Sequence, residues 1–323
     1  MRNPPDVPGV RSQRTRFQKL LAYLKRYWFL YLLVLPGFVF MIVFNYGPMY
    51  GIQLAFKDYH ANLGIWGSPW VGLEHFREMI ADANFWRAAK NTLIINGYNI
   101  VFKTTFTIFL ALMLNELRLK KVKSCVQTAA YLPYFLSWVI FAGLVQVFLE
   151  YPSSSGSSGG VINQVITFFG EPINFLTRPD LFRAIVVISN IIKNAGYGTI
   201  VYLASMSTIN PALYEAAKMD GSNRLQMMLH ITIPAILPTI VILLILDLSS
   251  LFSANFDQIY NLYNNYVLST GDVLSTYIYR ISLGGGTSFE LSTAINLVLQ
   301  VLGLIVVLIT NKFVSKLDIM GIF

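Results

Sequence analysis

NPALYEAAKMDGSNRLQMMLHITIP, residues 210–234, is a polar stretch set between two hydrophobic ones, and the rest of the chain is interpreted from it. Asn210 is a favourable N-cap, and Pro211 fits the first helical position, where its missing N–H costs nothing. Helix-favouring residues follow as far as Met219. Gly221 then supplies the left-handed conformation that a helix end often needs. A first short helix is therefore expected from residue 211 to residue 219.

A second helix is expected after the turn. Ser222 or Asn223 caps it, and Pro234 ends it. Its apolar positions fall on one face: Leu225, Met228, Leu229 and Ile233. On the first helix the residues of one face are small or flexible: Ala212, Glu215, Ala216 and Met219. The pattern predicts a helical hairpin, residues 210–234, with a face that another surface can approach closely.

The residues of this hairpin carry a family resemblance. Glu215-Ala216-Ala217, then Gly221, then Ile231-x-Ile233-Pro234 resembles the EAA signature of permease subunits of bacterial ABC importers. In that family the loop docks into a groove on the ATPase subunit. The resemblance implies a coupling contact made by Glu215, Ala216, Ala217, Asp220 and Gly221. From shape alone, an ordinary helical loop remains the alternative.

Composition places the chain in a membrane. Of 323 residues 55% are hydrophobic and 12% charged, and the mean hydropathy is +0.56, whereas soluble domains carry about 25% charged residues. A membrane-crossing helix needs roughly 20 apolar residues, and six stretches qualify: 28–49, 89–114, 126–149, 183–204, 236–256 and 292–311. We expect an all-α integral membrane domain, residues 28–323, with six transmembrane helices and no separate catalytic domain.

The segments outside these spans have distinct compositions. Residues 1–27 form a basic arm, of which 1–13 are predicted to be disordered, while 14–28 have the apolar spacing of a helix lying in the inner interface. A partner-binding helix is the alternative for 14–28. Residues 152–160, PSSSGSSGG, predict a flexible linker. The last residues, NKFVSKLDIMGIF, form a short tail that could pack against a partner.

Positive charge predicts the orientation. Fifteen Lys and Arg residues lie in the segments that are inside if the N-terminus is inside, and five lie in the opposite segments. The hairpin and both termini are therefore expected in the cytoplasm, and the protein in the bacterial inner membrane. The net charge of +8 is explained by this bias, and no basic patch with stacking aromatics indicates nucleic-acid binding.

The sequence offers no catalytic constellation. It has no GxxxxGK[ST] loop and no Ser/His/Asp or Cys/His cluster, and His60 and His75 lack a second ligand at metal spacing. Cys125, the one cysteine, is expected to be structural. We expect no enzyme activity, metal or cofactor in this chain, so that ATP and Mg²⁺ bind to another subunit.

Three charged residues interrupt the spans: Lys103, Lys193 and Asp247. Each lies eleven residues from the predicted inner end of its span, which at about 1.5 Å per residue is near the membrane centre. We expect them in one layer, with Asp247 paired to one lysine and the surplus cation facing the transport path. One interpretation is a structural pair plus a lysine in a wet crevice. The other is a positive charge that attracts an acidic sugar into the transport path.

Further polar and aromatic residues are candidates for contact with a sugar or a protein. The candidates for lining a sugar path are Asn190, Asn194, Tyr197 and Asn296. A tyrosine-rich external segment is interpreted first as an aromatic belt, and some of its members are expected to contact an external binding protein: Tyr260, Tyr263, Tyr266 and Tyr277.

A second resemblance suggests a substrate class. The stretch AFKDY followed by SPWVGL, within residues 55–73, is similar to a subgroup of carbohydrate importers for plant or algal oligosaccharides. The family implies a second permease, an ATPase dimer, an external sugar-binding protein and transport by alternating access. Uronate-containing oligosaccharides such as alginate fragments are the first expectation. An ion-coupled secondary transporter is the alternative, although only Asp247 offers a buried carboxylate, and a membrane enzyme is a third option without a catalytic set.

Overall fold

The computed structural model describes residues 16–152, 158–253 and 255–315, and the chain divides into two compact units, Met1–Gln53 and Leu54–Phe323. Every regular element within the described residues is helical, apart from an isolated bridge between Lys57 and Trp70. The expected all-α class is confirmed. The predictions for residues 1–13, for 153–157 of the linker and for 316–323 of the tail fall outside the described residues.

The described residues of the first unit form one long helical segment, which begins at Arg16. Helix α1, Arg16–Met41, leaves helical geometry at Tyr27 (φ −116°, ψ 22°) and continues into η1, Ile42–Tyr46, and η2, Gly47–Phe56. Residues Lys25–Phe56 are long and apolar enough to cross a membrane. The kink at Tyr27 coincides with the boundary expected at residues 27 and 28. The interfacial position of the part before it stays a prediction.

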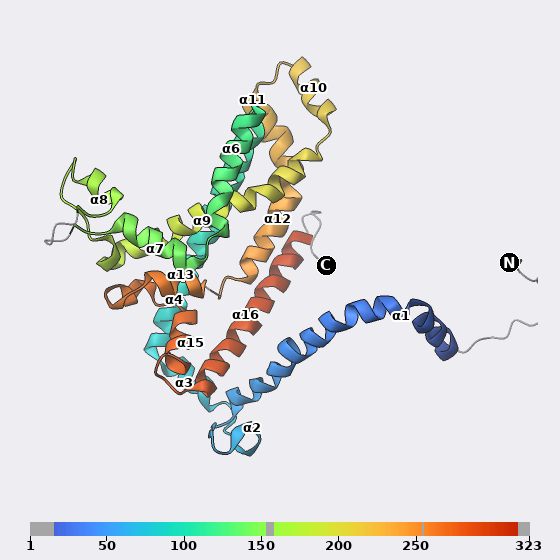
Figure 1. The fold of residues 1–323 in the computed structure, drawn as a ribbon, viewed down its shortest axis with the longest axis vertical. Helices are drawn as coiled ribbons and strands as arrows, with labels where there is room; N and C mark the ends of the chain where they lie inside the picture. The colour runs from blue at the N-terminus through green and yellow to red at the C-terminus, as the bar shows by residue number, and fades with distance from the viewer. Residues whose placement is uncertain (1–15, 153–157, 254, 316–323) are drawn as a thin grey trace, which may run out of the picture. The chain divides into compact units, whose positions relative to one another are not determined.

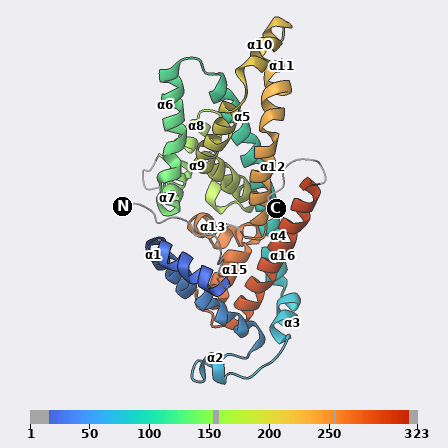
Figure 2. The same ribbon diagram turned by 90° about the vertical axis from the view of Figure 1, so that its right-hand side faces the viewer.

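Four further helical runs in the second unit could span a membrane (Figure 1). One comprises α4, Ala83–Tyr98, the π-helical turn η3, Asn99–Lys103, and α5, Thr104–Glu116. The others are α9, Pro179–Ser207; α11, η6 and α12 together, Arg224–Ser249; and α16, Phe289–Ser315. Helix α9 packs against α5, and α16 runs beside α12 (Figure 2).

The expected third span is broken. Helix α6, Lys120–Tyr131, and η4, Leu132–Phe135, meet α7, Trp138–Leu149, at an angle of 107°. Pro133 supplies no N–H to the helix, and Ser137 is extended (φ −63°, ψ 155°) with its side chain accepting a hydrogen bond from the Ile140 amide. The prediction of one continuous helix over 126–149 is therefore wrong. Within the described residues a sixth span exists only if this bent pair is counted as one.

Pro234 does not end the second hairpin helix, which is a second correction. Helix α11, Arg224–Met227, continues through the π-helical turn η6, Met228–Thr232, into α12, Ile233–Ser249. Pro234 lies directly after η6, where the backbone hydrogen bonds change from π to α spacing. A proline is tolerated at such a local adjustment because a partner is already missing there.

Short helices complete the unit. They are α2, Gly64–Gly67; α3, Glu74–Ala81; α8, Val161–Ile166; η5, Phe175–Thr177; α13, Phe256–Leu262; η7, Asn265–Val267; α14, Leu268–Gly271; and α15, Leu274–Ser282. The hairpin lies at one end of the second unit and α3 at the other (Figures 1 and 2). One buried cluster lies between α5, α9 and α12 near the hairpin: Ala111, Leu112, Tyr202, Met206 and Ile236.

Candidate functional site: an exposed helical hairpin and a polar pocket between the spans

The first helix and the turn of the hairpin have the local structure that their sequence predicts. Helix α10, Pro211–Met219, begins at Asn210, whose Oδ1 accepts from the Ala212 amide at 3.0 Å. Gly221 has φ +80°, a left-handed conformation that a side chain would strain. Asn223, rather than Ser222, caps the second helix: its Oδ1 accepts from the Gln226 amide at 2.9 Å, and Gln226 Oε1 accepts from the Asn223 amide at 2.8 Å.

Two polar contacts attach the hairpin to the spans, besides the apolar packing of Met228 and Ile233. The Tyr214 hydroxyl lies 2.9 Å from Thr232 Oγ1, which connects α10 to the base of α12. Arg224 lies 3.6 Å from Glu116 at the end of α5, and both side chains of this pair are largely exposed. The second contact adds little stability because exposed ion pairs are weak. Helix α10 is thus held on one side, through Tyr214.

The other side of α10 is open. Met219 is 88% exposed, and Glu215, Ala216, Asp220 and Gly221 are exposed as well, while Ala217 is half-buried. The helix extends beyond the neighbouring spans at this end (Figures 1 and 2). An apolar side chain so exposed next to small alanines is typical of a contact surface. The structure leaves the predicted coupling residues accessible to another protein, and their role stays a prediction.

A partly buried ion pair joins two of the spans. Lys103 Nζ in η3 donates to Asp247 Oδ1 in α12 at 2.7 Å, and Thr104 Oγ1 lies 3.4 Å from Asp247 Oδ2. The two side chains of the pair are 27% and 29% exposed. The expected pairing of Asp247 with one lysine is confirmed. The π-helical turn η3 carries Lys103, and such turns often occur where a helix aims a functional side chain.

A small polar pocket surrounds this pair. Its volume is about 120 Å³, and its lining comprises Asn96, Asn99, Ile100, Lys103, Asn190, Asp247, Ser250, Ser253 and Asn255. Asn190 Nδ2 lies 3.3 Å from Gln258 Oε1, and Asn194 Nδ2 donates to Asn190 Oδ1 at 3.0 Å. Asn99 Oδ1 is buried without a hydrogen-bond partner. The pocket therefore combines amide and hydroxyl groups with one cation and one carboxylate.

Lys193 does not face this pocket, which corrects the expectation of a surplus cation on the transport path. Its side chain is on α9 but only 4% of the residue is exposed. The ammonium donates to the carbonyls of Pro133 and Tyr134 at 3.1 Å each, and to the carbonyl of Leu136. The sequence could not predict this contact, because it depends on the unexpected break between η4 and α7.

Two other candidates for the sugar path lie outside the polar pocket. Tyr197 is 42% exposed and stacks on Tyr134, with ring centroids 3.9 Å apart and an angle of 4° between the planes. Asn296 is exposed on α16, and its Nδ2 donates to the Ser292 carbonyl at 3.0 Å. The structure thus brings together Lys103, Asp247, Asn190 and Asn194, but leaves Tyr197 and Asn296 apart from them.

The candidate tyrosines for contact with a binding protein have different environments. Tyr260 and Tyr263 lie 6.0 Å apart, and Tyr260 also packs edge-on against Tyr279 at 5.2 Å. A hydrogen bond with Tyr279 raises the pKa of Tyr260 above its ordinary value. Tyr266 is 72% exposed. These three remain candidates for the contact.

Tyr277 is not accessible, so it cannot be a surface contact in this structure. It is 3% exposed, and its hydroxyl donates to Asp82 Oδ2. Burial has the largest effect on the pKa of Tyr277 and raises it, and the hydrogen bond with Asp82 raises it further. Partial burial is the largest single effect and raises the pKa of Asp82, but the hydrogen bonds from Tyr277, Asn84 and the Phe85 amide together outweigh it and hold the pKa below 3.8.

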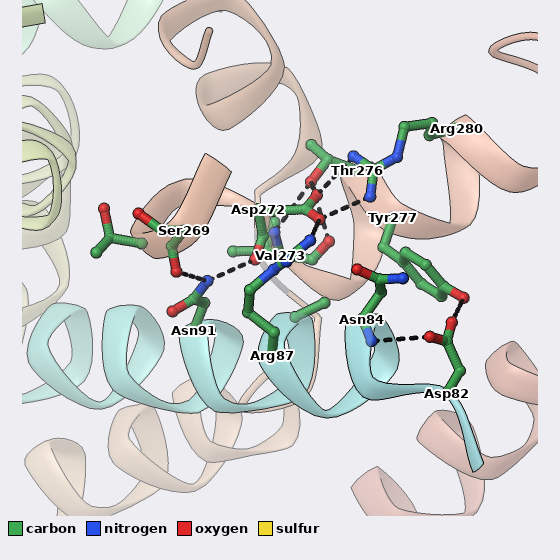
Figure 3. A network of polar contacts seen from close by, with 12 residues as sticks. Asp82, Asn84, Arg87, Asn91, Ser269, Asp272, Val273, Thr276, Tyr277 and Arg280 are labelled. Atoms are coloured by element: carbon green, nitrogen blue, oxygen red, sulfur yellow. Dashed lines mark hydrogen bonds and ion pairs between the residues drawn. The ribbon is translucent and has the colours of Figure 1, made fainter. Parts of the chain in front are cut away.

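Sequence reasoning missed a charged network at the end of the unit opposite the hairpin (Figure 3). Asp272 is fully buried and accepts from Arg280 at 2.7 and 3.1 Å and from Thr276 Oγ1 at 3.0 Å. Arg87 lies 3.7 Å from the same carboxylate. The network joins α15 to α4. Nothing in the sequence around Asp272 distinguishes it from an exposed turn residue.

Asn91 extends the same network to α9. Its Nδ2 donates to the carbonyls of Asp272 and Ser269 at 3.0 and 3.1 Å (Figure 3). Its Oδ1 accepts from Arg183 Nη2 at 2.8 Å. One amide therefore connects α4, the α14–α15 turn and α9. The opposite end of the unit is held by these polar contacts together with an apolar cluster that includes Phe85, Leu274 and Ile295. The hairpin end is held by the apolar cluster between α5, α9 and α12.

Comparison with known proteins identifies the family. Residues 103–318, which include the hairpin and most of the polar pocket, match the family described as binding-protein-dependent transport system inner membrane component. The chain belongs to this family. The resemblance inferred from the hairpin residues is confirmed.

Close relatives of this permease cover almost its whole length. It is 41% identical over 320 residues to the polygalacturonan/rhamnogalacturonan transport system permease protein YteP of Bacillus subtilis, covering 99% of this chain and 98% of that one. Its fold resembles a crystal structure of a bacterial ABC transporter involved in the import of the acidic polysaccharide alginate (TM-score 0.84, 41% identity, 92% and 99% coverage). It also resembles the bacterial alginate ABC transporter in complex with an alginate pentasaccharide-bound periplasmic protein (TM-score 0.85, 40% identity, 94% and 100% coverage).

Proposed function

We propose that this permease is one transmembrane subunit of an ATP-driven importer of acidic, uronate-containing oligosaccharides, with alginate fragments as the first candidates. The observation that carries the proposal is the full-length similarity to permeases of polygalacturonan, rhamnogalacturonan and alginate transport, all polymers that contain uronic acids. The polar pocket with Lys103 supports it because a carboxylate substrate needs a cation when it is removed from water.

The permease works with other subunits in this proposal. A second permease completes the membrane path, an ATPase dimer binds ATP and Mg²⁺, and a periplasmic or extracellular protein delivers the sugar. The hairpin and both termini face the cytoplasm, in a bacterial inner membrane. The permease itself is not catalytic. The open face of α10 supports the ATPase contact, because Glu215 and Met219 are exposed there and another protein can reach them.

ATP acts on the permease by favouring one packing of the helices over another. Closure of the ATPase dimer moves the groove that holds α10, and Tyr214 passes the displacement to α12 through Thr232. Because α12 carries Asp247, the same movement changes the polar pocket. Two states that differ in this way interconvert when a partner binds one of them better. The result is alternating access of the sugar path.

Lys103 is the residue proposed to meet the charge of the sugar. It is partly exposed and shares a single short contact with Asp247, so a substrate carboxylate can compete for the ammonium. The amides of Asn190 and Asn194 are suited to sugar hydroxyls. The stacked rings of Tyr134 and Tyr197, each partly exposed, offer an aromatic face to the C–H surface of a pyranose.

The ion-coupled alternative has less support. It requires a carboxylate that gains and loses a cation during transport. Asp247 is the candidate, but it is engaged by Lys103 at 2.7 Å and lies 3.4 Å from Thr104. The Lys103 ammonium already occupies one oxygen of this carboxylate, so a coupling cation would have to displace it.

Affinity purification tests the ATPase contact. Glu215→Arg places a positive, bulky side chain on the open face of α10, and we expect the ATPase subunit to be lost from the purified complex. Leu213→Ala is the matched control, because two residues along a helix point to nearly opposite sides. Leu213 is also exposed, at 51%. Retention of the ATPase by the Glu215 variant to the same extent as by the control would refute the coupling role.

Uptake by the complete importer tests the substrate class separately. With its binding protein, we expect ATP-dependent uptake of labelled alginate or galacturonate trisaccharides and much weaker uptake of neutral trisaccharides. We also expect Lys103→Met to raise the KM for the acidic sugars. Equal uptake of neutral and acidic trisaccharides would refute the acidic substrate but leave the importer role intact. Uptake that persists without ATP would instead favour the secondary carrier.

A further inference from the structure

The bend between η4 and α7 is held by a lysine from another helix. An ammonium group has three N–H donors, and Lys193 of α9 directs all three at carbonyls of the bend: those of Pro133, Tyr134 and Leu136. We infer that Lys193 is a positioning residue that locks the bent α6–α7 segment to α9, so that the bend moves with α9 during transport. This inference rests on the proposed function as an ATP-driven permease.

The environment of Lys193 explains why a buried charge is tolerated there. A helix end leaves its last carbonyls without intrahelical donors, and it carries a partial negative charge. The bend creates such an end in the interior of the unit, and Lys193 satisfies it. Three aromatic rings surround the ammonium, with centroids at 5.2 Å for Trp138, 5.7 Å for Phe141 and 6.0 Å for Tyr134. Ring faces attract cations most strongly where water is excluded.

A glycine on the same face of α9 reinforces the contact. Gly196 follows Lys193 by three residues and therefore points to the same side. A Cβ atom at Gly196 would overlap the backbone carbonyl of Ala130 in α6. Helix α9 thus approaches the backbone of α6 closely, one turn from the place where Lys193 binds the bend. Lys193 and Gly196 therefore make two independent contacts between α9 and the bent α6–α7 segment.

We call the contacts of Lys193 and Gly196 with the bent α6–α7 segment the joint. The position of α9 in the chain gives this joint a function. Helix α9 ends at Ser207 and α10 begins at Pro211, so a displacement of the hairpin is passed directly to α9. The joint then transfers it to α6 and α7. Tyr134 on η4 and Tyr197 on α9 stack across the joint, so the proposed aromatic face for the sugar keeps its shape while it moves.

Transport coupling is the readout that separates this role from sugar binding. In the complete importer with its binding protein, Lys193→Met removes the ammonium and keeps the length of the side chain. We expect the amount of sugar imported per ATP hydrolysed to fall by about fivefold or more, with the KM for sugar unchanged and with substantial rescue by Lys193→Arg. The matched control is Lys103→Met, another lysine within a span, which is expected to change KM instead.

Two results would overturn the inference. Lys193→Met could import as much sugar per ATP as the wild type, or it could change the KM and leave the coupling intact, which would place Lys193 in contact with the sugar. If the Lys193 variant fails to assemble, Gly196→Ala disturbs the same joint and is expected to lower coupling in the same way. A wild-type complex that imports no sugar with ATP refutes the proposed function instead.

A distance measurement tests the rigid joint directly and does not need a variant at position 193. Cys125, the one cysteine of the chain, is exposed on α6, and Ser207→Cys places a second label at the end of α9. In a complex whose other subunits lack cysteine, we expect the same spin-label distance with and without ATP and Mg²⁺. A distance that changes between these two states refutes the joint.

Discussion

Burial, rather than distance, should decide what an ion pair contributes to the stability of this permease. Arg280–Asp272 and Arg178–Asp180 have the same N–O distance, 2.7 Å. The Asp272 side chain is 0% exposed and that of Arg280 37%, whereas the second pair is 57% and 52% exposed. Arg280→Met leaves a buried carboxylate with fewer donors. Arg178→Met leaves an aspartate in water.

The expected cost follows from what remains around Asp272. Removing one partner of a buried pair costs roughly 3–5 kcal/mol. We expect about 3 kcal/mol for Arg280→Met, the low end of that range, because Arg280 is partly solvated and because Thr276 and Arg87 still face the carboxylate. For a chain of this size that corresponds to a fall in the thermal midpoint on the order of 5 °C.

The assay compares thermal midpoints of the purified variants in one detergent at one scan rate. Arg178→Met is the matched control, and its midpoint should equal that of the wild type. Arg87→Met should lie between the two, because Arg87 is 3.7 Å from the carboxylate. Equal shifts for Arg280→Met and Arg178→Met would refute the reasoning, since the two pairs differ in burial and not in length.

Three further predictions concern the pair within the spans, the hairpin turn and the opposite end. Lys103→Met leaves Asp247 unpaired and should lower the thermal midpoint, at a cost of up to about 2.5 kcal/mol, and adding Asp247→Leu should restore it; a lower midpoint in the double variant would contradict this. Gly221→Ala strains a left-handed residue by about 1–2 kcal/mol, so limited proteolysis of the hairpin should accelerate, and an unchanged rate would argue against the turn. The lowered pKa of Asp82 means that its hydrogen bond with Tyr277 stabilises the fold above the ordinary value of 3.8 and loses this effect as the pH falls below it. Tyr277→Phe should therefore lower the midpoint at pH 7 but much less at about pH 3, and a pH-independent difference would contradict the assignment.

Local patterns predicted the caps and the turn of the hairpin, although not the continuation of its second helix past Pro234. The caps at Asn210 and Asn223 and the left-handed turn at Gly221 depend on side chains within four residues of one another. The pairing of Asp247 with one of the two lysines was also predictable, because a charge in an apolar span needs an opposite charge at the same depth. Only the structure identified Lys103 as the partner. The first inference uses only the spacing of residues along one element. The second uses only the depth of charged residues in several spans.

Contacts between distant segments were not predictable in this way. Pro133 alone does not indicate a 107° bend, since prolines also occur inside straight spans, as Pro238 does in α12. Without the bend, three carbonyls within reach of the Lys193 ammonium could not be foreseen. Tyr277 was expected to contact an external binding protein because it lies in a tyrosine-rich external segment, but α15 turns it toward Asp82, which is 195 residues away in sequence.

The sequence by itself determined the membrane class, the hairpin and the family, because apolar length, capping residues and a short signature are properties of contiguous residues. Only the tertiary structure decided which charged groups are available to a substrate. Lys103 has the Asp247 carboxylate as its partner and stays partly exposed, whereas all three donors of Lys193 bind carbonyls of the protein. The physical reason is that a buried charge takes whatever partners the packed helices bring to it, and those partners come from parts of the chain that no local pattern connects.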